Sequence, residues 1–230
     1  GADAITYLDD EHWSWVRDDD GFTIPASVPG DVVTDLQAAG AIGDPLRDDN
    51  FVRDAPVWNR TWTLRTTFEA RSDAARVLLV FDGVKLGATV TLNHATLGTI
   101  RDQFLRYAFD VRNASIDLVR ETNKLELIFD PSIDVGGRFA ACSGGWDWAP
   151  RTETYHGQAS SFSKGVVGSV FLAFSEVHVP RITYVTPLIH YRGEPPTTRL
   201  VDGQHSGFDV RVRIHLHASA PTAVTIRVQP

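Results

Sequence analysis

Large apolar and smaller polar side chains alternate with a period of two residues along much of this chain. Over 62–68, tryptophan, leucine and phenylalanine alternate with threonine and arginine. Because successive side chains of a β-strand point to opposite faces of its sheet, this pattern predicts a strand with one buried face. Similar apolar patterns predict strands over 76–81, 90–92, 107–111, 125–129 and 170–179. Short strands separated by turn residues, such as Asn93-His94, are typical of an antiparallel β-sandwich or barrel.

One short helix interrupts this all-β pattern. Asp31 can cap its first turn, and Val33, Leu36 and Ala39 recur on one side of it. Gly40 then supplies the residue that commonly ends a helix. The spacing therefore predicts a helix from about residue 32 to residue 39 with one apolar face.

The pattern changes near Pro180, after which three further strands are expected, over 182–191, 208–218 and 222–228. Three strands are too few for an independent sandwich, which commonly takes about seven strands and about 100 residues. We therefore expect two domains, 1–180 and the incomplete 181–230, in a natural protein that continues beyond residue 230. An incomplete sheet exposes strand edges and apolar surface, which predicts self-association.

Composition excludes several classes of protein. The hydrophobic fraction of 43% is sufficient to fill a core, and the net charge of −7 argues against nucleic acid or an anionic membrane as the partner. No apolar run reaches the roughly 20 residues that a bilayer requires. Cys142 is the only cysteine, which excludes an internal disulfide and a multi-cysteine zinc site. His215 and His217 share one face of a strand, but no third metal ligand accompanies them.

Residues 144–151, Gly-Gly-Trp-Asp-Trp-Ala-Pro-Arg, form the most distinctive segment of the chain. The glycines and the proline predict a loop between strands. Trp146 and Trp148 offer flat rings that suit the apolar C–H faces of a sugar, and Asp147 can accept hydrogen bonds from hydroxyl groups. Arg151 can hold that carboxylate in place. The alternative is a structural corner in which the tryptophans pack into the core.

Several motifs together resemble the N-terminal region of β-mannosidases and the sugar-binding domain of family 2 glycoside hydrolases. The resemblance covers about residues 10–180 and implies a jelly-roll, galactose-binding-domain-like β-sandwich. The remainder resembles the start of an immunoglobulin-like sandwich domain. The matching motifs are Val28-Pro29-Gly30-Asp31, Asp35-Leu36, Asp44-Pro45, Asp49-Asn50, Phe81-Asp82-Gly83, Val90-Thr91-Leu92-Asn93, Phe109-Asp110-Val111, Asn123-Lys124-Leu125, Gly145-Trp146-Asp147-Trp148-Ala149-Pro150-Arg151 and 165–172.

This resemblance implies a retaining exo-glycosidase whose two catalytic glutamates lie on a (β/α)8 barrel that follows these domains. The sequence contains no Asn-Glu dipeptide, which precedes the family's acid/base carboxylate, and no strand–helix alternation that could form a barrel. We therefore expect this chain to hold no catalytic residue. It would be the non-catalytic part of an enzyme that hydrolyses terminal, non-reducing β-D-mannosides, with no cofactor.

The resemblance also assigns roles within the Trp-Asp-Trp segment. Asp147 would bind sugar hydroxyls, Trp146 would form an apolar wall, Trp148 would pack behind it, and Arg151 would orient the loop. The sequence departs from the usual pattern over 138–144 and 157–164. β-Galactosidase-like or glucosaminidase-like specificity therefore stays open, as does a stand-alone carbohydrate-binding module or a structural domain without a working sugar site.

Two tripeptides match the acceptor pattern for N-glycosylation. They begin at Asn59 and Asn113. Glycosylation at either asparagine requires a eukaryotic secretory route. Together with the family resemblance, the tripeptides favour a secretory or lysosomal protein.

Overall fold

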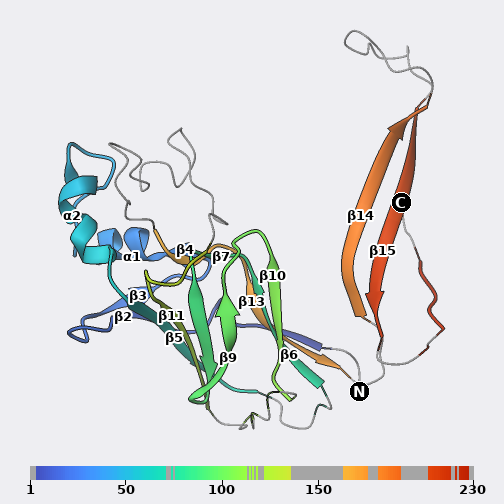
Figure 1. Ribbon diagram of the computed structural model, residues 1–230, viewed down its shortest axis with the longest axis horizontal. Coiled ribbons are helices and arrows are strands. Elements are labelled where there is room, and N and C mark those ends of the chain that lie inside the picture. Colours follow the sequence, from blue (N-terminus) through green and yellow to red (C-terminus); the bar gives the residue numbers. More distant parts are fainter. Residues whose placement is uncertain are drawn as a thin grey trace. The chain divides into compact units, whose positions relative to one another are not determined.

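The chain consists mainly of antiparallel β-strands, as the alternating pattern predicted. A computed structural model describes residues 4–70, 74, 76–112, 114, 116, 118, 122–135, 163–175, 181–192, 207–218, 221 and 223–227. The chain divides into two compact units, Gly1–Ser175 and Glu176–Pro230. Each unit is described separately below, and Figure 1 shows their elements.

The larger sheet of the first unit has six antiparallel strands in the order β3-β2-β5-β11-β8-β9. Its strands are β3 (Thr23–Ala26), β2 (Trp13–Arg17), β5 (Trp62–Phe68), β11 (Asn123–Phe129), β8 (Ala88–Leu92) and β9 (Ala95–Ile100). Along β11 buried and half-buried residues alternate without interruption. The period-two pattern over 125–129 therefore indicated the correct faces of this strand.

The described part of the first unit also contains two smaller sheets. The four-stranded sheet has the order β1-β13-β6-β10, and a three-stranded sheet of two-residue strands has the order β4-β12-β7. Their strands are β1 (Ala4–Tyr7), β13 (Val170–Ser175), β6 (Arg76–Asp82), β10 (Arg106–Asp110), β4 (Gly30–Asp31), β12 (Gly165–Val166) and β7 (Val84–Lys85).

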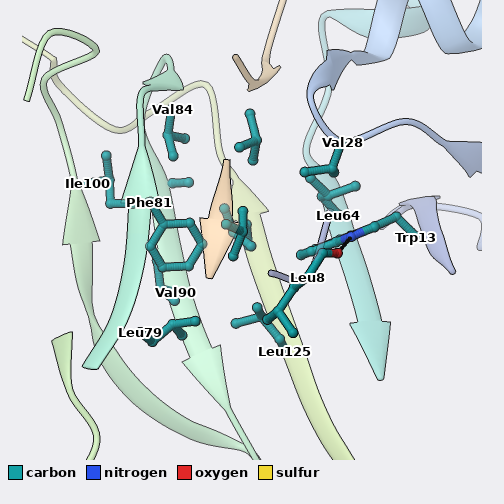
Figure 2. Close-up of a cluster of buried hydrophobic side chains, with 14 of the residues drawn as sticks. Leu8, Trp13, Val28, Leu64, Leu79, Phe81, Val84, Val90, Ile100 and Leu125 are labelled. Atoms are coloured by element: carbon teal, nitrogen blue, oxygen red, sulfur yellow. Dashed lines mark hydrogen bonds between the residues drawn. The ribbon is translucent and has the colours of Figure 1, made fainter. Parts of the chain in front are cut away.

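The hydrophobic core lies between the four-stranded and six-stranded sheets. Figure 2 shows Leu79 and Phe81 from β6 pointing into the same interior as Val90 from β8 and Leu125 from β11, all of them buried. Burial of a side chain of this size contributes roughly 1.5–3 kcal/mol. This interior gives the first unit the all-β sandwich that was predicted.

The predicted short helix is present. α1 (Val32–Ala38) begins after Asp31, whose side chain accepts hydrogen bonds from the backbone N–H groups of Val33 and Thr34 at 3.0 and 3.1 Å. Gly40 follows the helix with a φ of +70°, which residues with a Cβ rarely adopt. The apolar face that includes Val33 and Leu36 is buried in the core.

A second helix, α2 (Asn50–Trp58), was not predicted from the sequence. Pro56 lies inside it, and a proline lacks the N–H group that an interior helical residue donates. The helix is nevertheless fixed at its end, because Trp58 is fully buried and Arg60 Nε donates to the Pro56 carbonyl oxygen at 3.0 Å. Tertiary packing therefore outweighs the local preference for a loop here.

The second unit contains one long antiparallel hairpin of β14 (Arg181–Tyr191) and β15 (Phe208–His217). The pairing register places eight apolar residues on one face of this hairpin. They are Val185, Pro187, Ile189, Tyr191, Phe208, Val210, Val212 and Ile214. The prediction of a third strand over 222–228 is wrong for residues 223–227. These residues are described, and they do not pair with any described strand.

Candidate functional site

The four residues predicted to contact a sugar lie outside the described part of the chain. Trp146, Asp147, Trp148 and Arg151 all fall within 136–162. The structure does describe where the chain leaves the sandwich for this segment and where it rejoins it. We call these two stretches, residues 130–135 and 163–166, the neck. Figure 1 shows α1, β4 and β7 toward the end of the first unit where the neck lies.

The outgoing side of the neck is a compact turn directly after β11. Asp130 Oδ1 accepts the Ser132 N–H at 2.8 Å, and the Ile133 N–H donates to the Asp130 carbonyl oxygen at 3.0 Å. The bonds from Ser132 lower the pKa of the Asp130 carboxyl, because they favour its ionised form. Arg101 then donates to the carbonyl oxygen of Asp134 at 2.9 Å. Side-chain and backbone bonds thus fix the turn up to residue 134.

Close packing against Gly87 also holds the outgoing side. A Cβ added to Gly87 would lie 2.4 Å from Ile133 Cγ2 and 3.2 Å from Val135 Cγ1. Contacts below 3.0 Å are essentially never seen for a real Cβ, so a side chain at position 87 would require Ile133 to move. Gly87 follows β7 by two residues, and the outgoing side of the neck therefore lies against the chain next to this short strand.

The returning side of the neck contains β12, which pairs with β4 and β7. β12 lies between β4 and β7, and Gly165 is opposite both Asp31 and Lys85. The Val32 N–H donates to the Lys164 carbonyl oxygen at 2.9 Å, and Ser163 Oγ donates to Asp31 Oδ1. Asp31 therefore caps α1 and receives the returning chain with the same carboxylate. Both ends of 136–162 consequently meet the sandwich beside β7.

Lys164 is the most unusual charged group of the neck, because only 3% of its surface is exposed. Its Nζ donates a hydrogen bond to the carbonyl oxygen of Arg60, which lies between α2 and β5. Burial lowers the pKa of Lys164 to about 8, and the charge of Asp130 opposes this shift. The lysine interacts with both Asp130 on the outgoing side and the chain that precedes β5.

A hollow of about 390 Å³ lies next to this position, lined by Asp18, Asp19, Arg60 and Thr61. Arg60 forms an ion pair with Asp19, and Asp18 Oδ1 accepts the Thr63 hydroxyl at 2.8 Å. Asp18, Asp19 and Asp20 are all exposed. The sequence did not indicate the pair of Arg60 and Asp19, because these two residues are 41 positions apart.

The remaining predicted residues have separate outcomes. Asn59 is exposed immediately after α2, so its position permits modification, but no observation tests whether it is glycosylated. Asn113, Cys142 and His217 belong to the residues or side chains that are not described.

Among the side chains that the structure covers, no three histidine, cysteine, aspartate or glutamate groups gather as metal ligands would. None of the described helices is long and apolar enough to cross a membrane.

Comparisons with known proteins agree with the architecture. Residues 13–139 match the model of the family described as glycosyl hydrolase 2 galactose-binding domain-like. The β-mannosidase of Rattus norvegicus is 28% identical over 206 residues, which cover 75% of this chain and 22% of that protein. β-Mannosidase B of Thermothelomyces thermophilus is 31% identical over 169 residues, which cover 61% of this chain and 19% of that protein.

Two solved structures share the fold. The β-D-mannosidase of Dictyoglomus thermophilum superimposes with a TM-score of 0.63 at 22% identity, covering 93% of this chain and 31% of that one. The exo-chitosanase of Amycolatopsis orientalis superimposes with a TM-score of 0.59 at 17% identity, covering 82% of this chain and 22% of that one. This chain thus spans about a fifth to a third of the lengths of these relatives. Because the family model matches more than half of the chain, the chain belongs to the galactose-binding-like domains of the family 2 glycosyl hydrolases.

Proposed function

We propose that this chain is the N-terminal, non-catalytic part of a retaining β-mannosidase and supplies a loop to its sugar pocket. The observation that carries the proposal is the Trp146-Asp147-Trp148 segment in a chain whose curated relatives include β-mannosidases. The substrate would be a terminal, non-reducing β-D-mannoside. The partners would be this carbohydrate and the remaining domains of the parent protein, which hold the two catalytic glutamates.

The neck supports the part of the proposal that concerns the loop. A loop that contacts a substrate must start and end at well-fixed points. A small displacement of a binding group removes much of its contribution to substrate binding and catalysis. Both ends of 136–162 are held beside β7, by Gly87 on one side and by Asp31 and Lys85 on the other. Trp146, Asp147, Trp148 and Arg151 would then contact the sugar from a rigid base.

The sugar preference rests on sequence relatives rather than on the fold. The same sandwich occurs in an exo-chitosanase and in a β-galacturonidase from Eisenbergiella tayi, so the fold alone does not select the sugar. The curated relatives at 28% and 31% identity are β-mannosidases. These relatives favour mannose over galactose and glucosamine.

The proposal is tested with an Asp147→Ala variant of the full-length parent. Loss of a charge-assisted hydrogen bond of about 2 kcal/mol or more lowers kcat/KM for p-nitrophenyl β-D-mannoside by roughly 30-fold or more. The matched control is Asp10→Ala, because Asp10 is an exposed aspartate in the turn that follows β1. An Asp147→Ala parent with unchanged kcat/KM would contradict the role of the loop.

The hollow lined by Asp18, Asp19, Arg60 and Thr61 favours a second candidate, a stand-alone carbohydrate-binding module. Carboxylate, guanidinium and hydroxyl groups together suit the hydroxyl groups of a sugar. A binding module has measurable affinity for mannose or a mannoside without any other domain. Titration calorimetry on the isolated chain separates the two candidates, since the loop of an incomplete enzyme pocket retains negligible affinity.

A further inference from the structure

We propose that the hollow lined by Asp18, Asp19, Arg60 and Thr61 binds one sugar unit of an oligosaccharide substrate, a unit other than the terminal mannose. The inference rests on the proposed function, because it assigns a further part of the same substrate. The ligand class is a neutral sugar unit with neighbouring hydroxyl groups, as in a β-linked oligomannoside. All four lining residues belong to the described part of the chain.

The first argument is that the lining side chains are fixed and still have atoms open to a ligand. Asp18 Oδ1 accepts the Thr63 hydroxyl at 2.8 Å, and Arg60 Nε donates to the Pro56 carbonyl oxygen at 3.0 Å. Among the described residues, no group bonds to Asp18 Oδ2, Arg60 Nη2 or Thr61 Oγ1. An acceptor, a donor and a hydroxyl group therefore line one hollow of about 390 Å³.

The second argument is that these groups match the hydroxyl groups of a neutral sugar. Each sugar hydroxyl can donate one hydrogen bond and accept another, so two neighbouring hydroxyls can donate to Asp18 and accept from Arg60. The ion pair with Asp19 holds the Arg60 guanidinium in place for this contact. Two carboxylates and one guanidinium give the lining a net negative charge, which disfavours an acidic sugar.

The third argument is that the backbone under the hollow is fixed before any ligand binds. The Asp18 N–H donates to the Thr61 carbonyl oxygen at 3.2 Å, which joins the turn after β2 to the chain before β5. β2 and β5 also pair directly, with Arg17 opposite Trp62. Side chains on so firm a base lose little freedom when a ligand binds, so their contacts are retained as affinity.

A contact with the neck assigns the hollow to the same substrate as the loop. Lys164, on the returning side of the neck, donates through Nζ to the carbonyl oxygen of Arg60. Arg60 thus bonds to the neck through its backbone and lines the hollow with its side chain. Three open groups hold a single sugar unit weakly. The contribution of the hollow therefore becomes measurable when the rest of the oligosaccharide is bound by the parent.

The test compares KM of the full-length parent for a β-linked mannotriose with KM for p-nitrophenyl β-D-mannoside, which carries a single sugar unit. Asp18→Asn keeps the size of the side chain, and its amide oxygen can still accept the Thr63 hydroxyl. The variant removes the charge that strengthens a hydrogen bond from a sugar hydroxyl. The ratio of the mannotriose KM to the p-nitrophenyl mannoside KM should rise about five- to tenfold.

A second variant removes a different group from the hollow. Thr61→Val replaces the hydroxyl by a methyl group and leaves the backbone bond to Asp18 possible. It should raise the same ratio about threefold, because a neutral hydrogen bond contributes less than a charged one. The two variants act at separate side chains, so a folding defect in one of them, seen as a lowered melting temperature, leaves the other as the test.

The matched control is Asp48→Asn, which neutralises an exposed aspartate that pairs with Arg47 and does not line the hollow. This variant should leave the KM ratio within about twofold of the wild-type ratio. An unchanged ratio in Asp18→Asn and Thr61→Val would overturn the proposal. An equal rise of both KM values would also overturn it, since a general disturbance of the protein affects both substrates alike.

The choice of substrates separates this proposal from the proposed function. A wild-type parent that hydrolyses another glycoside contradicts the proposed function, and the ratio is then measured with the trisaccharide of that sugar. For a parent that hydrolyses none, titration calorimetry with mannotriose replaces kinetics. Affinity that Asp18→Asn weakens would support the hollow, and absent or unaffected affinity would overturn it. A parent active on mannosides with an unchanged ratio contradicts only the role of the hollow.

Discussion

Lys164 shows how the charge of a single buried side chain can oppose folding. Burial of the ammonium group lowers the pKa of Lys164 to about 8 in the folded chain, from an ordinary value of 10.5. Between these two pH values the unfolded chain binds more protons than the folded chain. Stability therefore rises with pH through this window, and the cost of the buried charge is fully present below about pH 8.

This titration predicts a difference between the wild-type chain and Lys164→Met. From about pH 7.5 to about pH 9.5 the free energy of unfolding of the wild type should rise by about 2 kcal/mol more than that of Lys164→Met. Arg60 and Asp130 interact with Lys164, while Asp31 and Lys85 pair with its neighbours Ser163 and Gly165, and all four are unchanged in both proteins. Urea denaturation at both pH values measures the difference. Parallel changes in the two proteins would show that Lys164 does not titrate in this window.

Single residues also show what sequence reasoning can and cannot reach. The alternation of β11 and the Asn93-His94 turn, where both residues have positive φ, follow from local patterns and were predicted correctly. The link from Lys164 to Arg60 was missed, because nothing in the local sequence indicates a contact across 104 positions. Local periodicity identifies faces and turns, while long-range polar contacts depend on the completed fold.

Among the elements, the short ones hold the neck and the long ones form the core. β4, β7 and β12 have two residues each, and they join α1 to both ends of 136–162. Strands this short carry too little pattern to be predicted from alternation. α2 was missed for a different reason, since a proline such as Pro56 is unfavourable inside a helix, while the buried Trp58 fixes the helix in the folded chain.

Packing at the neck predicts that Gly87→Ala is harmful. The added methyl group would lie 2.4 Å from Ile133 Cγ2, so the outgoing turn must move. Overpacking of this kind costs about 1–3 kcal/mol of the free energy of unfolding, which thermal or urea denaturation detects. Gly43→Ala is the control, because its methyl group meets only the flexible ends of Asn50 and Arg53. Equal stability of the two variants would show that Ile133 can yield.

For the whole molecule, the second unit differs from the first in the exposure of its apolar residues. One face of the β14–β15 hairpin carries Ile189 and Val210, which are 67% and 62% exposed and lie opposite each other. A hairpin with one apolar face suits the start of a sandwich domain, and we propose that 181–230 begins the immunoglobulin-like domain. We likewise propose that the two domains span 1–180 and 181–230.

The exposed apolar face predicts self-association of the 230-residue chain. Light scattering should detect dimers or larger species at micromolar concentrations, because a contiguous apolar surface favours association. Ile189→Lys, on the apolar face, should shift the chain toward the monomer. Thr186→Lys, on the opposite face of the same strand, should not. A wild-type chain that is monomeric under these conditions contradicts the prediction.

We propose that this chain supplies the sugar-contacting loop of a β-mannosidase. The most direct test is hydrolysis of p-nitrophenyl β-D-mannoside by the full-length parent, beside the corresponding β-galactoside and β-glucosaminide. We expect selective release from the mannoside that Asp147→Ala removes and Asp10→Ala leaves intact. Release from none of the three glycosides, together with measurable mannose affinity of the isolated chain, would contradict it and favour a binding module.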